Sequence, residues 1–277
     1  MFRTRKRIAK VAAITVTAAG ALLGGGAAAQ AAPATTHAIL LLISGYSSDG
    51  NGGNGIADKS PKEIRHQAHQ ALLGAKSVRI ALKDTGSDAQ KGNRPSSADL
   101  SYDQAGCTGS IAMGTQGSFQ IVKRGTEAWM KPDATFWKTT KVPGSEGTAG
   151  AERFKNRYIH GTTNDAIFKK LADVCSIKVF QKPLGGVAPF TDVKKGTETT
   201  FNGMKAIPLT GKVDGRAATY YVATQGKPYL IGGTQKGNGT DLTFTLSDYD
   251  KPIPSATPSA NESVEVSQLE SQLQGAS

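Results

Sequence analysis

Residues 199–247 decide the fold class, and they read TTFNGMKAIPLTGKVDGRAATYYVATQGKPYLIGGTQKGNGTDLTFTLS. Asn202-Gly203 lies between two extended arms, and an Asn-Gly pair in that position is the strongest short signal for a β-hairpin. Further turn signals that contain glycine follow at Asp214-Gly215, Gln225-Gly226 and 236–239. Residues 242–246 alternate apolar and polar side chains, as a strand with one buried face does. This part of the chain is therefore predicted to be a series of antiparallel strands.

A second group of strands is predicted upstream. Residues 78–83 alternate apolar and polar side chains, and residues 84–98 are expected to form a loop. Extended segments bounded by Gly or Pro follow at 99–104, 108–113, 117–123 and 127–131. We expect these segments to form an antiparallel meander, in which Trp129, Phe136 and Trp137 are core side chains rather than a sugar-binding platform.

Two helices are predicted in addition to the strands. Ser60 precedes Pro61 and lies three residues before Glu63, so an N-cap, a first-turn proline and a capping box coincide at the start of a helix over 61–73. Residues 151–175 show a second helical pattern. Strands, helix and strands again, joined by hairpins, predict an α+β domain over 56–251, built on one long antiparallel sheet with the helices covering its apolar face.

The N-terminal segment predicts export. Basic residues fill the first ten positions, an apolar run of small residues follows, and Ala29-Gln30-Ala31 fits the small-x-small rule for signal peptidase. We expect a signal peptide over 1–31, although a retained membrane anchor is the alternative. Residues 32–55 combine a second apolar burst with a spacer rich in Ser, Gly and Asn, and the Pro/Ser-rich residues 252–277 are expected to be a disordered tail.

The charge excludes one class of partner. The formal net charge is +11, and without the five cationic residues of the signal peptide the excess is +6. Because this excess is spread along the chain without interleaved aromatics, we expect no nucleic-acid surface. Attraction to an anionic membrane surface or wall polymer stays open.

The chain has two cysteines, Cys107 and Cys175. In an oxidising compartment an isolated pair within one domain most simply forms a disulfide, which here would connect a helix end to the sheet. A metal site is the alternative, but no His lies near either cysteine at zinc spacing.

No motif predicts catalysis or a cofactor. A nucleophile elbow is absent, and the glycine clusters do not lie between a strand and a helix as phosphate loops do. His66 and His69 are better explained as part of a solvated helix face than as metal ligands. The apolar residues of the alternating strands are predicted to face one interior that is partly open to ligand, and they are Val78, Ile80, Leu82, Ile111, Met113, Phe119, Ile121, Leu242, Phe244 and Leu246.

Six short stretches accompany this order of helices and strands, and they are 103–109 (DQAGCTG), 171–175 (LADVC), 201–203 (FNG), 219–222 (TYYV), 226–230 (GKPYL) and 246–249 (LSDY). With these stretches the chain resembles the actinobacterial LppX/LprA/LprF/LprG-type lipoproteins, relatives in shape of the LolA lipoprotein carrier. The resemblance implies a half-open barrel, a curved antiparallel sheet with helices across its concave face. It also implies an apolar cavity, which holds acyl chains of lipids or glycolipids in characterised relatives.

The chain departs from the family at the lipid anchor. Leu42-Ile43-Ser44-Gly45 looks like the start of a lipobox, but Tyr46 occupies the position of the family's modified cysteine. Because diacylglycerol attachment needs a thiol, we expect an extracellular or envelope-associated protein that is not covalently lipidated.

Two functions follow from these observations. The first is a monomeric, non-enzymatic carrier or chaperone of lipids or other amphiphiles, since an apolar cavity retains acyl chains at about 0.8 kcal/mol per buried methylene. The alternative is an accessory protein that binds an envelope protein or a wall polymer and has no ligand cavity. The volume of any enclosed apolar cavity distinguishes the two.

Overall fold

The computed structural model describes residues 52–139, 154–181 and 190–268, all within one compact unit, Ser48–Ser277. The predicted signal peptide and the lipobox-like segment lie outside these residues. None of the helices formed by the described residues is long and apolar enough to cross a membrane.

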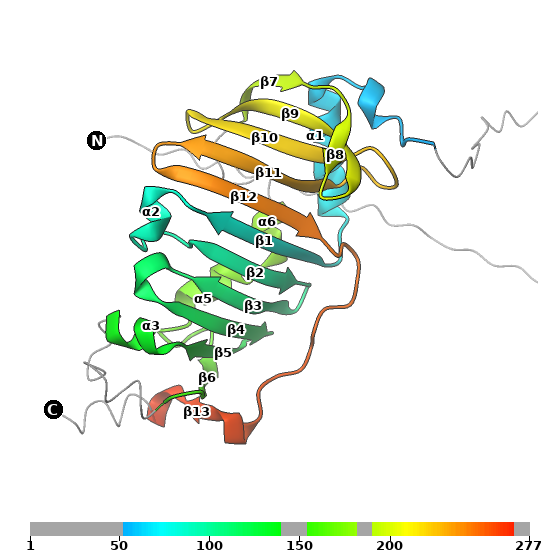
Figure 1. The fold of residues 1–277 in the computed structure, drawn as a ribbon. Helices are drawn as coiled ribbons and strands as arrows, with labels where there is room; N and C mark the ends of the chain where they lie inside the picture. The colour runs from blue at the N-terminus through cyan, green and yellow to red at the C-terminus, as the bar shows by residue number, and fades with distance from the viewer. Residues whose placement is uncertain (1–51, 140–153, 182–189, 269–277) are drawn as a thin grey trace, which may run out of the picture. The chain divides into compact units, whose positions relative to one another are not determined.

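One long sheet dominates these residues (Figure 1). Its 13 strands follow the order β13-β6-β5-β4-β3-β2-β1-β12-β11-β10-β9-β7, and β8 also pairs with β9. Every pairing is antiparallel except that of β13 with β6. The strands are β1 (Val78–Asp84), β2 (Ser97–Tyr102), β3 (Gly106–Ala112), β4 (Ser118–Arg124), β5 (Glu127–Pro132), β6 (Tyr158–Thr162), β7 (Thr191–Lys195), β8 (Thr199–Phe201), β9 (Met204–Val213), β10 (Arg216–Ala223), β11 (Leu230–Gly237), β12 (Thr240–Ser247) and β13 (Ser263–Glu265). The predicted α+β class with a long antiparallel sheet is confirmed.

The helices are short apart from the first. They are η1 (Ile56–Asp58), α1 (Pro61–Leu73), α2 (Ser87–Gln90), η2 (Gly114–Gln116), α3 (Ala134–Thr139), α5 (Lys169–Val174), α6 (Ile177–Gln181) and η4 (Ala260–Glu262). In Figure 1, α1, α5 and α6 lie behind the sheet. We call the side of the sheet that they cover the helix face and the other side the outer face.

Helix α1 begins as predicted. The Ser60 hydroxyl accepts from the Glu63 amide at 3.3 Å, and the Glu63 carboxylate accepts from the Ser60 amide at 3.0 Å. The Ser60 hydroxyl also donates to the Glu63 carboxylate at 2.6 Å, and this hydrogen bond, together with that from the Ser60 amide, holds the pKa of Glu63 below its ordinary value. At the other end of α1 the side chain of Gln181 donates to the backbone oxygens of Leu72 and Leu73, at 3.3 and 3.2 Å, so α6 supplies a donor to the last carbonyls of the helix.

The helix predicted over 151–175 is wrong in its first half. Tyr158–Thr162 form strand β6, and only Lys169–Val174 are helical; residues 151–153 lie outside the described part. Ile159 is buried on one side of β6 while its neighbours are half-buried, which is the alternation of a strand. The β-branched and aromatic residues of this segment favour a strand, and its glycine disfavours a helix, so pairing with β5 overrides the weak helical pattern.

The boundaries predicted for the domain are also too narrow. Asn54, expected in a flexible spacer, donates from its side chain to the carbonyls of Ala223 and Gly226, both at 3.0 Å. Within the tail expected to be disordered, Val264 is 5% exposed and pairs with Ile159 as part of β13. Asn54 and β13 are held on the domain because its backbone offers partners that a composition argument does not register.

Three smaller differences concern the meander. The loop expected over 84–98 contains helix α2 and the first two residues of β2. Residues 103–104 are not part of β2, because the Asp103 carboxylate accepts from the Ala105 and Gly106 amides and forms the turn to β3. Trp137, expected within the meander, lies on α3.

Candidate ligand site on the helix face

The strand register lines up side chains on the helix face in rows that run across the sheet. Residues directly paired in neighbouring strands point to the same side. Leu209, Tyr220 and Val222 line one small pocket together with residues of α1, which identifies their side of the sheet as the helix face. Successive pairs define the rim row, which consists of Tyr220, Gly233, Phe244, Leu82, Ala98, Ile111, Phe119 and Pro132. A central row lies two residues further along the strands on the same face. It consists of Leu246, Ile80, Leu100, Gly109, Ile121, Met130 and Ile159.

The two rows differ in exposure. The central row is packed, and none of its six side chains is more than 8% exposed. In the rim row Leu82, Ala98, Phe119 and Phe244 are only half-buried. Apolar side chains on four strands therefore keep contact with solvent along one side of the interior.

Gly233 lets the rim row stay continuous. A Cβ atom at this position would lie 2.5 Å from the Thr219 carbonyl oxygen and 2.6 Å from Cδ1 of Tyr220. Because glycine leaves this space empty, the rings of Tyr220 and Phe244 meet edge to face with centroids 5.6 Å apart.

Under α1 the interior is filled. The apolar pocket between α1 and β9–β11 is lined by Ala68, Leu72, Leu209, Val222 and four further residues, and its volume is about 10 Å³. That is room for about one water molecule and not for an acyl chain. An acyl ligand therefore needs a place further along the sheet.

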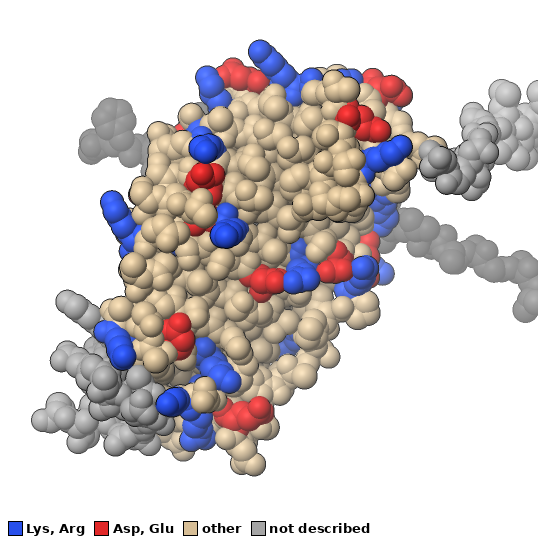
Figure 2. Space-filling view, viewed as in Figure 1, with Lys and Arg blue, Asp and Glu red and all other residues tan. Residues whose placement is uncertain are grey.

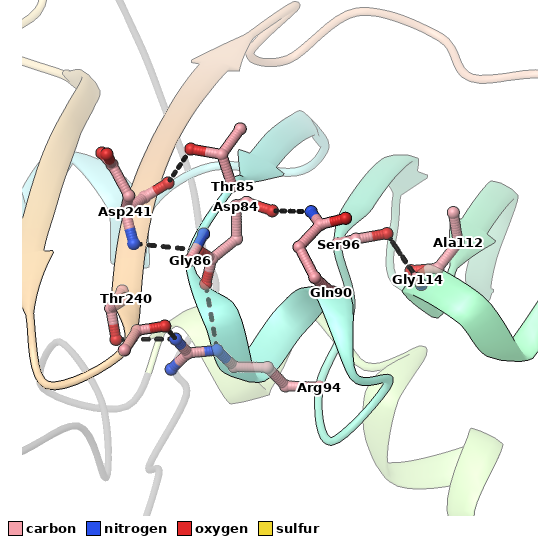
Figure 3. A network of polar contacts seen from close by, with 11 residues as sticks. Asp84, Thr85, Gly86, Gln90, Arg94, Ser96, Ala112, Gly114, Thr240 and Asp241 are labelled. Carbon is pink, nitrogen blue, oxygen red and sulfur yellow. Dashed lines mark hydrogen bonds and ion pairs between the residues drawn. The ribbon is translucent and has the colours of Figure 1, made fainter.

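Polar groups border the rim row where the strands end (Figure 3). Asp84, 3% exposed, lies two residues beyond Leu82 on the same face. One of its carboxylate oxygens accepts from the amides of Gly86 and Asp241, at 2.8 and 2.9 Å, and the other forms an ion pair with Arg94 at 3.0 Å. Arg94 in turn donates to the Gly239 carbonyl at 2.9 Å. The network connects the loop after β1 to the start of β12 and fixes the position of the rim.

A second polar pair lies beside this network. Gln235 donates from its side-chain amide to the Tyr220 hydroxyl at 2.9 Å, and both side chains are buried. Burial raises the pKa of Tyr220 above its ordinary value, although the hydrogen bond from Gln235 opposes this shift. The rim thus combines a row of apolar side chains with a border of neutral or paired polar groups.

The disulfide holds the helices on this face. Cys107 of β3 and Cys175, which follows α5, are bonded with Cα atoms 5.0 Å apart. Both cysteines are fully buried. The predicted pairing is confirmed, and it connects the segment of α5 and α6 to the middle of the sheet.

The outer face is polar and carries a groove of about 520 Å³ between β1–β3 and residues 251–254. Arg79 and Asp99 in the groove form two hydrogen bonds, at 2.7 and 2.5 Å, and Lys251 pairs with Asp248 at 2.8 Å. Basic and acidic side chains are interspersed over this face (Figure 2). A ligand on this face would therefore be recognised by hydrogen bonds and shape, and not by an electrostatic potential of uniform sign.

No family model matches the sequence, and no curated protein does. The crystal structure of LprF from Mycobacterium bovis is similar, with a TM-score of 0.51, 11% identity, and coverage of 72% of this chain and 97% of that chain. The fold is that of LprF. The lipoprotein LppX from Mycobacterium tuberculosis is matched at a TM-score of 0.44 with 16% identity, over 70% of this chain and 99% of that chain. The likeness to LprF shows the architecture alone, and the chemistry of the site has to be argued from the residues of this chain.

The ten residues predicted to share one interior have definite places in these rows. Leu82, Ile111, Phe119 and Phe244 are in the rim row, and Ile80, Ile121 and Leu246 are in the central row. Val78 is fully buried, Met113 packs against the core cluster, and Leu242 is half-buried beside Asp84. Whether any of them touches a ligand stays a prediction.

Sequence reasoning missed several residues of the same interior, among them Tyr220 and Leu100. The sequence does contain a signal for Tyr220, because the apolar side chains of Ala218, Tyr220 and Val222 occupy every second position of β10. The structure buries all three. Leu100 alternates in the same way in β2. Trp137 is buried, as predicted for a core side chain, but it lies on helix α3.

Proposed function

We propose that this protein is an exported, non-enzymatic carrier or binding protein for lipids or other amphiphiles. The ligand would lie on the helix face along the rim row, with its acyl chains toward the core and its polar part at the border formed by Asp84, Arg94 and Gln235. The half-buried state of Leu82, Ala98, Phe119 and Phe244 is the observation that carries this proposal.

The physical argument is one of solvation. Apolar surface left in contact with water costs about 25 cal/mol per Å², so a row of half-buried apolar side chains favours an apolar ligand. Removing an acyl chain from water contributes binding free energy in the same way, at about 0.8 kcal/mol per buried methylene. The LprF-like fold and the family resemblance of the sequence support the same function. Among the described residues no cluster of three or more metal-ligating side chains occurs.

The test uses tryptophan as a local reporter. Phe119→Trp and Phe244→Trp place an indole in the rim row, and Gln120→Trp places one on the exposed outer face of the same strand, β4. Each variant is made in a protein in which Trp129 and Trp137 are replaced by Phe, so that the introduced indole is the only one. Addition of dipalmitoyl phosphatidylglycerol is expected to shift the emission of the two rim variants to the blue and to leave that of Gln120→Trp unchanged. Mass spectrometry of organic extracts from the secreted protein should find a co-purifying amphiphile. No response from either rim variant, with no amphiphile in the extract, would contradict the proposal.

The groove on the outer face favours a second candidate, binding of a wall polymer. The groove is open and polar, and its four charged side chains, Arg79, Asp99, Asp248 and Lys251, form two pairs of opposite sign. A neutral polymer rich in hydroxyl groups matches such a surface better than a polyanion does. Ser110→Arg, which would fill the groove, is expected to abolish co-sedimentation with isolated cell walls and to leave lipid binding intact.

A further inference from the structure

Helix α3 is fixed rigidly beside the rim row. The Asp133 carboxylate accepts from the Phe136 amide at 2.6 Å, and through its other oxygen it accepts from the amide and hydroxyl of Ser118 at 2.9 and 2.8 Å. Gly117 brings the backbones close together, because a Cβ atom there would lie 2.3 Å from the Phe136 nitrogen. The side chains of α3 are thereby held in fixed positions against β4.

Phe136 connects α3 to the rim row itself. Its ring meets the ring of Phe119 edge to face, with centroids 5.4 Å apart and planes at 67°. The next residue, Trp137, is 2% exposed, and its ring centroid lies 5.7 Å from that of Phe154. Trp137 therefore belongs to the same apolar interior as the proposed ligand site.

The indole N–H of Trp137 is buried and has no acceptor among the residues that the structure describes. Buried tryptophans usually find a hydrogen-bond partner, and a buried donor without one costs about 1–3 kcal/mol. A water molecule that took the place of the acceptor would need two to four polar partners of its own. The orphaned donor is a reason to look for an acceptor on the ligand.

We propose that the Trp137 indole N–H donates a hydrogen bond to a carbonyl oxygen of the bound amphiphile, so that the ligand class is ester- or amide-linked acyl lipid. A charged acceptor such as a carboxylate would be costly in this apolar surrounding, whereas a carbonyl is a neutral acceptor. An ester carbonyl also lies at the boundary between acyl chain and head group, as Trp137 lies beside the rim row. This inference rests on the proposed function and narrows it.

The experiment compares two lipids that differ only in the carbonyl. Dipalmitoyl phosphatidylglycerol and its dihexadecyl ether analogue have the same head group and equally long chains. The delipidated full-length exported protein is titrated with each, and tighter binding of the ester by about tenfold is expected. The matched variant carries 3-benzothienylalanine at position 137, which keeps the ring shape and replaces N–H by sulfur. In this variant the preference for the ester is expected to disappear.

Nuclear magnetic resonance gives a direct readout of the donor. In the Trp129→Phe protein the only remaining indole N–H signal is that of Trp137, and it should move downfield with the ester lipid but not with the ether lipid. In the lipid-free protein, the benzothienyl replacement should leave the unfolding midpoint unchanged or raise it. A lowered midpoint would reveal an acceptor within the protein and overturn the inference.

The two levels of the proposal fail in different ways. Equal affinity of the unmodified protein for ester and ether lipids would overturn the role of Trp137 while leaving the carrier function in place. Binding of neither lipid would overturn the carrier function, and the inference with it.

Discussion

The imidazole of His160 lies flat against the indole of Trp129, with ring centroids 4.6 Å apart and planes 11° apart. Its two nitrogens contact the carboxylates of Glu127 and Glu265, at 2.7 and 2.8 Å. Because a neutral imidazole has only one N–H, the protonated ring is the form that donates to both carboxylates. His160 thereby connects β13, which contains Glu265, to β5 and β6 of the sheet.

The first prediction concerns pH. Burial disfavours the charged ring, but hydrogen bonds and charge from Glu265 and Glu127 outweigh it, so the pKa of His160 lies above its ordinary value. A raised folded-state pKa gives stability that is complete below the unfolded pKa of about 6.5 and is lost as pH rises through the folded pKa. Amide-exchange protection of Val264 should therefore fall as pH rises through this range.

The controls for this effect are two glutamine variants. His160→Gln is expected to give low protection of β13 that no longer depends on pH in this window. His66→Gln changes an exposed histidine of α1 and should behave like the unmodified protein. A protection factor at Val264 that stays constant over the same pH range in the unmodified protein would contradict the prediction.

The second prediction concerns the disulfide. Cys107 and Cys175 close a loop of sequence separation 68, and the chain-entropy model assigns such a crosslink roughly 4 kcal/mol of unfolding free energy. Replacement of both cysteines by serine should lower the unfolding free energy in urea by roughly that amount and remove any sensitivity to reductant. An unmodified protein whose unfolding midpoint is the same with and without dithiothreitol would show that the crosslink does not stabilise it.

The third prediction concerns the polar network at the rim. Asp84→Asn removes the charge that pairs with Arg94. Because the side chain of Arg94 is 29% exposed, the unfolding free energy should fall by about 2 kcal/mol, less than the 3–5 kcal/mol typical of breaking a fully buried pair. The comparison is Asp99→Asn, which removes the partner of Arg79. Since the side chains of Arg79 and Asp99 are 46% and 45% exposed, the unfolding free energy is expected to fall by only about 0–1 kcal/mol. Equal losses in the two variants, measured by urea unfolding, would show that burial of Asp84 does not matter.

The fourth prediction uses the small residue of the rim row. Ala98 lies between Leu82 and Ile111 and is half-buried, so Ala98→Phe should fill the proposed site and weaken binding of dipalmitoyl phosphatidylglycerol at least about tenfold, or about 1.4 kcal/mol. Ala81→Phe adds the same ring to the outer face of the neighbouring strand. It should leave binding unchanged, and equal binding by both variants would place the ligand elsewhere.

The fifth prediction concerns Tyr46, which lies outside the described residues. If the segment before it is a lipobox without its thiol, Tyr46→Cys should allow labelling with palmitate and should move the protein into the detergent phase. The unmodified protein should stay in the aqueous phase. Labelling of the unmodified protein would show that its anchor has been misread.

The sequence by itself determined the features that depend on neighbouring residues. Helix α1 could be predicted because Ser60, Pro61 and Glu63 act within one turn. The strands around Leu82 and Phe244 could be predicted because side-chain alternation repeats every two residues. The disulfide followed from two cysteines in a chain expected to be exported.

Only the tertiary structure decided which strands become neighbours and where the apolar row stays open. Asp84 accepts from the amide of Asp241, and β13 pairs with β6, although each pair is far apart in sequence. Such contacts depend on closing long loops and on matching the hydrogen-bonding groups of two strand edges, which no local pattern encodes. The half-buried state of the rim row and the surroundings of the Trp137 indole likewise come from packing between distant elements. The sequence could therefore name apolar strand residues such as Leu82 and Phe119, but not the row that they form across the sheet.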